Sequence, residues 1–241
     1  MTDPFAINPQ LAPVPVISDV FNRRFSKEAN LFVYSRTLDS EADFDGLAIR
    51  LWKTLGAGSF FNISSAYKRV TATLDGAIAC EGPIGKAAAQ VKHDMMLFSA
   101  HCDNVNLRLV DHDCYHDILY AYHQDGEAGD EVGSRVMTCY TVGATKFLPN
   151  DNASAYLIDD KYKAFHPVDP KRCHTFNLGD VWKQACMNTY DIPPVIHAAE
   201  ELPVDSTGPR MLLVGDRFRI SDFKETPNWA QRMAGFLRNR P

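Results

Sequence analysis

Residues 104–220 consist of short apolar segments separated by turn-forming residues, and this pattern constrains the fold more than any other feature of the sequence. The runs are rich in Val, Ile, Leu, Tyr, Phe and Thr, and Gly, Pro, Asn and Asp interrupt them. β-Branched and aromatic residues favour strands, whereas the interrupting residues favour turns. About seven closely spaced strands are typical of a β-sandwich or barrel. They are predicted within 104–111, 117–124, 135–143, 173–187, 194–202 and 209–220.

Helical patterns flank this strand-rich part. Residues 40–58 begin with acidic residues, continue with apolar residues at helical spacing and end with glycines, which predicts a helix. A second helix is predicted at 83–101, where Ala, Met, Leu and Lys are frequent. Residues 221–241 predict a short amphipathic C-terminal helix. Residues 1–17, with four prolines, predict an extended arm that covers a sheet edge.

The length and composition suit one domain. The chain has 241 residues and is 45% hydrophobic, which is enough to bury one sizeable core. The expected fold class is mainly β with flanking helices (α+β) in a single domain, 1–241. Within it we expect an N-terminal arm with bracing helices at 1–103, a strand-rich core at 104–220 and the C-terminal helix at 221–241.

Charge, hydropathy and cysteine spacing exclude several classes of protein. The formal net charge is -5 and no long run of like charge occurs, so no nucleic-acid partner is expected. The sequence contains neither a membrane-spanning apolar run nor a secretory signal pattern, so we expect a soluble, cytoplasmic protein with no membrane partner. The six cysteines form no C-x-x-C pair, which favours reduced thiols over a zinc ribbon or a disulfide scaffold.

A candidate metal-ligand pattern lies at the end of the strand 117–124. His123 and Asp125 are two residues apart, and on a strand such positions point to the same side. His197, 72 residues after Asp125 and within the apolar strand 194–202, is a third candidate. Two imidazoles and one carboxylate form the facial triad that holds Fe(II) and leaves open positions. These three residues are therefore predicted to be both the metal ligands and the catalytic centre.

Other residues leave alternatives open for the metal site. His101 and Asp103 repeat the pattern at a predicted helix end, where a capping role is favoured. Residues 112–117 contain two histidines and two aspartates in a predicted turn, and such a cluster is typical of a solvated loop. His166 and His174 flank a proline-bearing loop and remain alternatives for the third ligand.

A cation and two hydroxyls are candidates for binding a carboxylate-bearing cosubstrate. Arg210 opens a strand thirteen residues after His197, and an arginine there could clamp the far carboxylate of 2-oxoglutarate through two parallel hydrogen bonds. Thr138 and Tyr140 share one face of the strand 135–143, and their hydroxyls could bind the same cosubstrate. Arg135 is either a rival cation or a surface arginine.

The order of these motifs resembles that of the Fe(II)/2-oxoglutarate-dependent dioxygenase superfamily. More narrowly, the segments YHQDG, RVMTCYTVGATKFLPND, VIHAAEELP and GPRMLLVGD look like those of a little-characterised bacterial family of unknown function. The resemblance covers about residues 104–220. It implies a double-stranded β-helix, a jelly-roll or cupin-like barrel. It also implies that His123, Asp125 and His197 are the iron ligands and that Arg210 holds the distal carboxylate of 2-oxoglutarate.

The expected function is therefore that of an Fe(II)- and 2-oxoglutarate-dependent oxygenase. It would use O2 to hydroxylate a small molecule or an amino-acid side chain, with release of succinate and CO2. One alternative is a non-catalytic metal-binding or sensor module on the same barrel. Another is a cupin-type hydrolase or isomerase that uses the metal as a Lewis acid.

Overall fold

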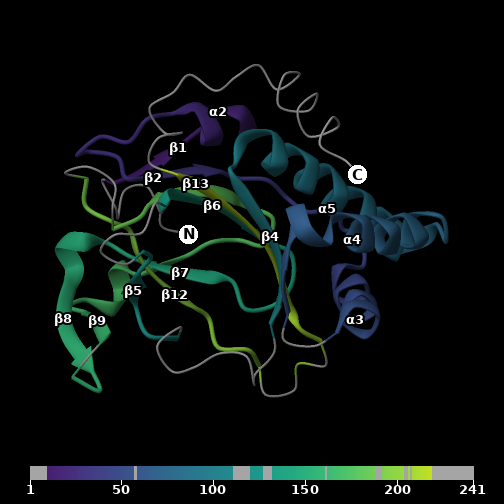
Figure 1. Ribbon diagram of the computed structural model, residues 1–241. Coiled ribbons are helices and arrows are strands. Elements are labelled where there is room, and N and C mark those ends of the chain that lie inside the picture. Colours follow the sequence, from purple (N-terminus) through teal and green to yellow (C-terminus); the bar gives the residue numbers. More distant parts are fainter. Residues whose placement is uncertain are drawn as a thin grey trace.

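The described part of the chain forms two main sheets, a two-stranded hairpin and a layer of helices. In Figure 1 the smaller sheet, which contains β5 (His123–Gln124), β7 (Thr145–Leu148) and β12 (Ile196–Ala199), lies on one side of the larger sheet. Helices α2 (Ile17–Asn22) and α5 (Gly82–His101) lie on the other side. The computed structural model describes residues 10–56, 59–110, 120–126, 132–160, 162–187, 192–203, 206 and 208–218, with the backbone alone for 59–67. The predicted C-terminal helix, 221–241, lies outside these residues, as does the histidine- and aspartate-rich turn 112–117.

The larger sheet has seven strands in the order β1-β2-β11-β6-β13-β4-β3. Neighbouring strands are antiparallel, except that β1 and β2 are parallel. β1 lies at the edge of the sheet, so the described part of the predicted N-terminal arm does cover a sheet edge. The strands are β1 (Leu11–Pro13), β2 (Leu31–Tyr34), β3 (Ser59–Asn62), β4 (Asn104–Val110), β6 (Val132–Cys139), β11 (Val181–Ala185) and β13 (Arg210–Phe218).

The smaller sheet has four antiparallel strands in the order β10-β7-β12-β5. A hairpin, β8 and β9, packs on its outer face, where Phe165 joins Leu148 and Ile196 in an apolar cluster. The strands are β5 (His123–Gln124), β7 (Thr145–Leu148), β8 (Ala153–Ile158), β9 (Tyr162–Pro167), β10 (His174–Thr175) and β12 (Ile196–Ala199). Two short 3-10 helices, Asn150–Asn152 and Pro170–Arg172, flank the hairpin.

Two of the helices, α3 (Phe44–Leu55) and α5, were predicted from the sequence, and two others, α2 and α4 (Ile63–Ile78), were not. α3 begins at Asp43, whose side chain accepts a hydrogen bond from the Gly46 N–H, and it ends at Gly56 with a φ of 104°. α5 (Gly82–His101) matches the second predicted helix. Among the described residues, no helix combines the length and the apolar character needed to cross a membrane.

Side-chain alternation gives the larger sheet two different apolar faces. Val136 and Leu213 point toward the helices and belong to the larger core cluster. Their neighbours Met137 and Val214 point toward the smaller sheet and belong to a second cluster, together with the fully buried Trp182. The space between the two sheets therefore has its own set of inward-facing residues. The predicted class, mainly β with helices, is confirmed, and the two sheets remain separate.

Candidate metal centre

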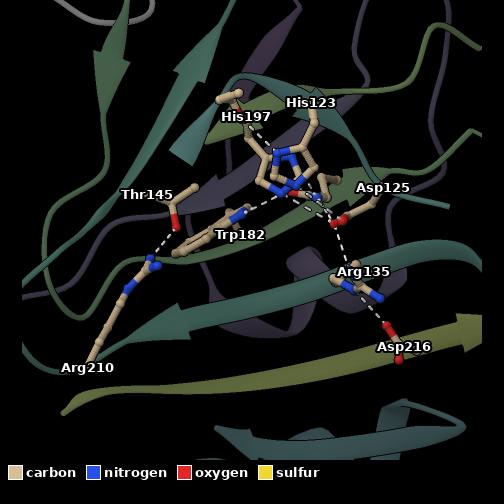
Figure 2. A network of polar contacts seen from close by, with 10 residues as sticks. His123, Asp125, Arg135, Thr145, Trp182, His197, Arg210 and Asp216 are labelled. Carbon is tan, nitrogen blue, oxygen red and sulfur yellow. Dashed lines mark hydrogen bonds and ion pairs between the residues drawn. The ribbon is translucent and has the colours of Figure 1, made fainter. Parts of the chain in front are cut away.

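Strand pairing places the two predicted histidine ligands side by side. His123 of β5 and His197 of β12 are directly opposite each other in the antiparallel ladder, and their ring centroids are 4.6 Å apart. Directly opposite residues project from the same face of a sheet. Asp125 follows β5 by one residue and turns its carboxylate toward both rings, as Figure 2 shows. The three residues that the sequence predicted as ligands are thus brought together.

The geometry of this group fits a metal ion. One ligand atom of each residue lies within 4.8 Å of the other two. His197 Nε2 is 3.4 Å from Asp125 Oδ2, and His123 Nε2 is 3.9 Å from Asp125 Oδ1. Metal bonds of about 2.1 Å at right angles would place ligand atoms about 3 Å apart. These separations exceed that value by about 1 Å or less, so a small movement of the three residues would bring them to the facial arrangement.

Backbone contacts hold the short β5 segment in place. His123 Nδ1 lies 2.9 Å from the Ala121 carbonyl oxygen, and a proton on Nδ1 leaves the Nε2 lone pair for a metal. The Met187 N–H donates to the Asp125 carbonyl oxygen at 2.8 Å, and the Phe165 N–H donates to the carbonyl oxygen of Tyr122 at 2.9 Å. The two ligands on this segment are therefore positioned from both sides.

Two further side chains contact the carboxylate, and each of them has a partner of its own. Asp125 Oδ2 forms an ion pair with Arg135 Nη1 at 2.8 Å and accepts a hydrogen bond from Gln184 Nε2, also at 2.8 Å. Arg135 Nε donates to Asp216 Oδ1 at 2.7 Å. Gln184 Oε1 accepts from the Trp182 Nε1–H at 3.2 Å. Figure 2 shows Arg135 lying between Asp125 and Asp216, and with ion pairs to both carboxylates it is not a surface arginine.

These charges set the protonation states of the group. Burial acts to raise the pKa of Asp125, but the charges of Arg135 and the nearby histidines outweigh it and hold that pKa well below its usual range. Burial lowers the pKa of His197 to about 4, although the Asp125 carboxylate acts in the opposite direction. At neutral pH Asp125 is ionised and His197 is neutral. Carboxylate and neutral imidazole are the forms that bind metals.

Arg210 reaches the same space between the sheets from the other end. Arg210 begins β13 and is buried, with only 2% of its surface exposed to solvent. Its Nη2 donates to Thr145 Oγ1 at 2.8 Å. Thr145 lies opposite Ala199, two residues beyond His197 on β12, which is about 7 Å along the strand. Arg210 therefore crosses from the larger sheet to the smaller one, at a distance from His123, Asp125 and His197 (Figure 2).

Thr138 and Tyr140 lie on the opposite face of the larger sheet. The Tyr140 hydroxyl donates to the buried Asp94 of α5 at 2.8 Å, and Thr138 Oγ1 donates to the Gly179 carbonyl oxygen at 3.4 Å. Burial and then the Asp94 carboxylate raise the pKa of Tyr140 well above its usual value, so this hydroxyl stays protonated. The two residues do share a face, as expected, but it is the helix-facing one. The structure does not bring them to the candidate metal centre.

The three histidines weighed as alternatives, His101, His166 and His174, also lie apart from the group. His101 ends α5 and stacks on Phe21, with the ring centroids 4.6 Å apart. His166 stacks on Tyr156 of the hairpin at 3.9 Å, and His174 packs edge-on against Phe176 at 5.7 Å. Within the part of the chain that the structure describes, His123, Asp125 and His197 form the one cluster of histidine, cysteine and carboxylate groups that could hold a metal ion.

The sequence analysis missed Gln184 and Asp216. Gln184 alternates with Trp182 along β11, so the inward-facing tryptophan could have placed it between the sheets. Asp216 offers no such local sign, because its partner Arg135 is 81 residues away along the chain.

The sequence matches no family model and no curated protein.

Proposed function

We propose that this protein is an Fe(II)- and 2-oxoglutarate-dependent oxygenase. The observation that carries the proposal is the group His123, Asp125 and His197 between the two sheets, with the buried Arg210 in the same space. Two imidazoles and one carboxylate with open metal positions are the ligand set of non-haem Fe(II) oxygenases. A carboxylate of a cosubstrate chelated at such a centre requires a fixed cation nearby, and Arg210 would fill this role.

The pairing of the strands supports a jelly roll as the scaffold. Eight strands lie in the two sheets from β4 to β13, with the β8 and β9 hairpin inserted between β7 and β10. The first of the eight pairs with the last (β4 and β13), the second with the seventh (β5 and β12), the third with the sixth (β6 and β11) and the fourth with the fifth (β7 and β10). A long antiparallel ribbon that is rolled up produces this nesting, which is the arrangement of a jelly roll.

Different residues would bind the metal, orient the cosubstrate and exclude water. His123, Asp125 and His197 would hold the metal, and Arg210 with the Thr145 hydroxyl would orient the far carboxylate of 2-oxoglutarate. The buried Trp182 and its apolar neighbours would keep bulk water from the space between the sheets. The chemistry that bound Fe(II) supplies is activation of O2, coupled to decarboxylation of 2-oxoglutarate to succinate and to hydroxylation of a small molecule or an amino-acid side chain.

A cosubstrate titration tests the proposal. The protein loaded anaerobically with Fe(II) should develop a weak visible charge-transfer band when 2-oxoglutarate is added. Arg210→Met should weaken 2-oxoglutarate binding at least about tenfold, because it removes charge-assisted hydrogen bonds, while Fe(II) affinity stays unchanged. Arg172→Met, which removes an exposed ion pair with Asp151, is the matched control.

Two other outcomes would favour the alternatives. Tight Fe(II) binding without the charge-transfer band would indicate a metal-binding or sensor module. Substrate turnover that proceeds equally well without O2 would indicate a hydrolase or isomerase that uses the metal as a Lewis acid.

A further inference from the structure

The two carboxylate oxygens of Asp125 have different surroundings. Oδ2 is within 2.8 Å of both Arg135 Nη1 and Gln184 Nε2. Oδ1 lies 3.9 Å from His123 Nε2, which is too far for a hydrogen bond. Oδ2 also lies 3.4 Å from His197 Nε2, so each oxygen faces one of the two histidines, and Oδ2 is the one held by two protein donors.

The direction of the Gln184 amide is set by Trp182. An indole N–H can only donate, so the Gln184 atom that faces Trp182 Nε1 must be the carbonyl oxygen. This leaves the amide NH2 toward Asp125 Oδ2, at 2.8 Å, and toward His197 Nδ1, at 3.4 Å. Gln184 is completely buried, so its side chain has no alternative partner in water. The hydrogen bond to Asp125 is therefore specified by the packing around it.

Arg135 is held in an equally defined position. Arg135 lies directly opposite Gln184 on β11 and directly opposite Asp216 on β13, so the three side chains form one row across three strands. Asp216 accepts from Arg135 Nε, and this orients the Nη1 end toward Asp125. We call Arg135, Gln184 and Asp216 the carboxylate row.

We propose that Asp125 binds the metal through Oδ1 alone, and that Arg135 and Gln184 are positioning residues that keep Oδ2 away from the ion. This inference rests on the metal-binding part of the proposed function and not on the cosubstrate. With Oδ2 occupied, the carboxylate contributes one ligand atom instead of two. Three coordination positions then remain for other ligands, as an oxygenase with a chelating cosubstrate requires.

Two variants test the inference through the metal alone. Gln184→Met removes the donor at similar volume, and Arg135→Met removes the ion pair. Each should weaken Co(II) binding about 10- to 100-fold, the usual effect of losing a partner of a metal ligand. Each should also change the intensity of the Co(II) visible absorption, because a released carboxylate can turn and bind through both oxygens. Arg172→Met, at the opposite edge of the smaller sheet from β5, should leave both values unchanged.

The outcomes separate this inference from the proposed function. Failure of the wild-type protein to bind Co(II) or Fe(II) would remove the metal centre itself. Metal binding by the wild type, with the same affinity and spectrum in both variants, would overturn only the inference. Weaker binding with an unchanged spectrum would overturn it as well, because a purely structural contribution would act in that way. Circular dichroism checks the fold of each variant, and Gln184→Met decides the matter if Arg135→Met does not fold.

Discussion

His197 is the most buried of the three candidate ligands, whereas His123 and Asp125 are partly exposed. It is also the candidate ligand that comes from a different strand, β12, so a metal bound by all three residues would join two segments of the chain. Its replacement therefore removes a ligand that nearby water cannot easily replace.

We expect His197→Ala to abolish Fe(II) binding in an anaerobic titration, with a loss of at least about 100-fold in affinity. His166→Ala and His174→Ala serve as controls and should leave the affinity unchanged, because both side chains pack against aromatic rings away from the group. Metal binding that survives the first change and disappears with either control would show that the third ligand is misassigned.

Tyr140 offers a second test at the scale of one residue. Tyr140→Phe removes one hydrogen bond to the buried Asp94 carboxylate, which keeps its bonds from Arg36 and Gln90. We expect a loss of about 1–3 kcal/mol in the free energy of unfolding by urea, with no change in 2-oxoglutarate affinity. Tyr156→Phe on the exposed hairpin should cost less than about 0.5 kcal/mol. A large drop in cosubstrate affinity for Tyr140→Phe would restore the role that the sequence suggested.

Helix α5 approaches the larger sheet unusually closely where it passes Gly215 of β13. A Cβ atom at Gly215 would lie 2.4 Å from Cys102 Sγ and 3.0 Å from Phe98 Cδ1. Glycine is needed here for space, since any side chain would push the helix away from the sheet.

Gly215→Ala should therefore destabilise the protein by about 1–3 kcal/mol through overpacking. Gly76→Ala in α4 is the matched control, because a Cβ atom there would lie 3.9 Å from the end of the Arg50 side chain. There alanine should be neutral or stabilising by up to about 1 kcal/mol through its better helix propensity. Thermal unfolding of both variants measures the difference, and equal melting temperatures would contradict the close approach.

Elements with local start and stop signals could be predicted from the sequence, and the others could not. α3 has an N-cap and a terminal glycine, and α5 has a long stretch of good helix formers. α4, with several β-branched and hydroxyl residues, has a weaker intrinsic preference. β8 and β9 were missed because their turn contains Asp159 and Asp160 at positive φ instead of the usual glycine.

The residues of the candidate metal group could be predicted from the sequence, but the side chains around them could not. The ligands follow from a two-residue spacing and a distal histidine, both visible in the sequence. Thr138 and Tyr140 were placed on a common face, but alternation alone does not tell which face of a strand meets which layer. That choice depends on α5, whose Asp94 binds Tyr140, and on Asp216, which fixes Arg135 on the other side. Such contacts between distant segments become visible only in the folded molecule.

The stability of the whole metal-free protein should depend on pH through His197. Its pKa is about 4 in the folded state and about 6.5 when unfolded, so the unfolded chain binds the extra proton between these values. The free energy of unfolding should therefore fall as the pH drops from about 6.5 to about 4, by on the order of 3 kcal/mol from this residue. Asp125, whose folded pKa is depressed, adds a further loss only below about pH 4.

Urea unfolding of the metal-free protein and of His197→Asn across this range measures the effect. The variant should lack the share that His197 contributes, so the two stability profiles should diverge as the pH rises from 4 to 6.5. Parallel profiles would mean that His197 is not kept neutral by burial.

The short β5 strand has a consequence for how fast a metal could exchange. β5 is two residues long, lies at the edge of the smaller sheet and carries His123, with Asp125 just beyond it. Segments with few ladder hydrogen bonds open far more often than a whole domain unfolds. Opening of this one segment would detach two of the three ligands together while β12 and His197 stay in place. The lifetime of a bound ion would then follow the opening rate of β5, and the fold could remain intact through many cycles of loading and release.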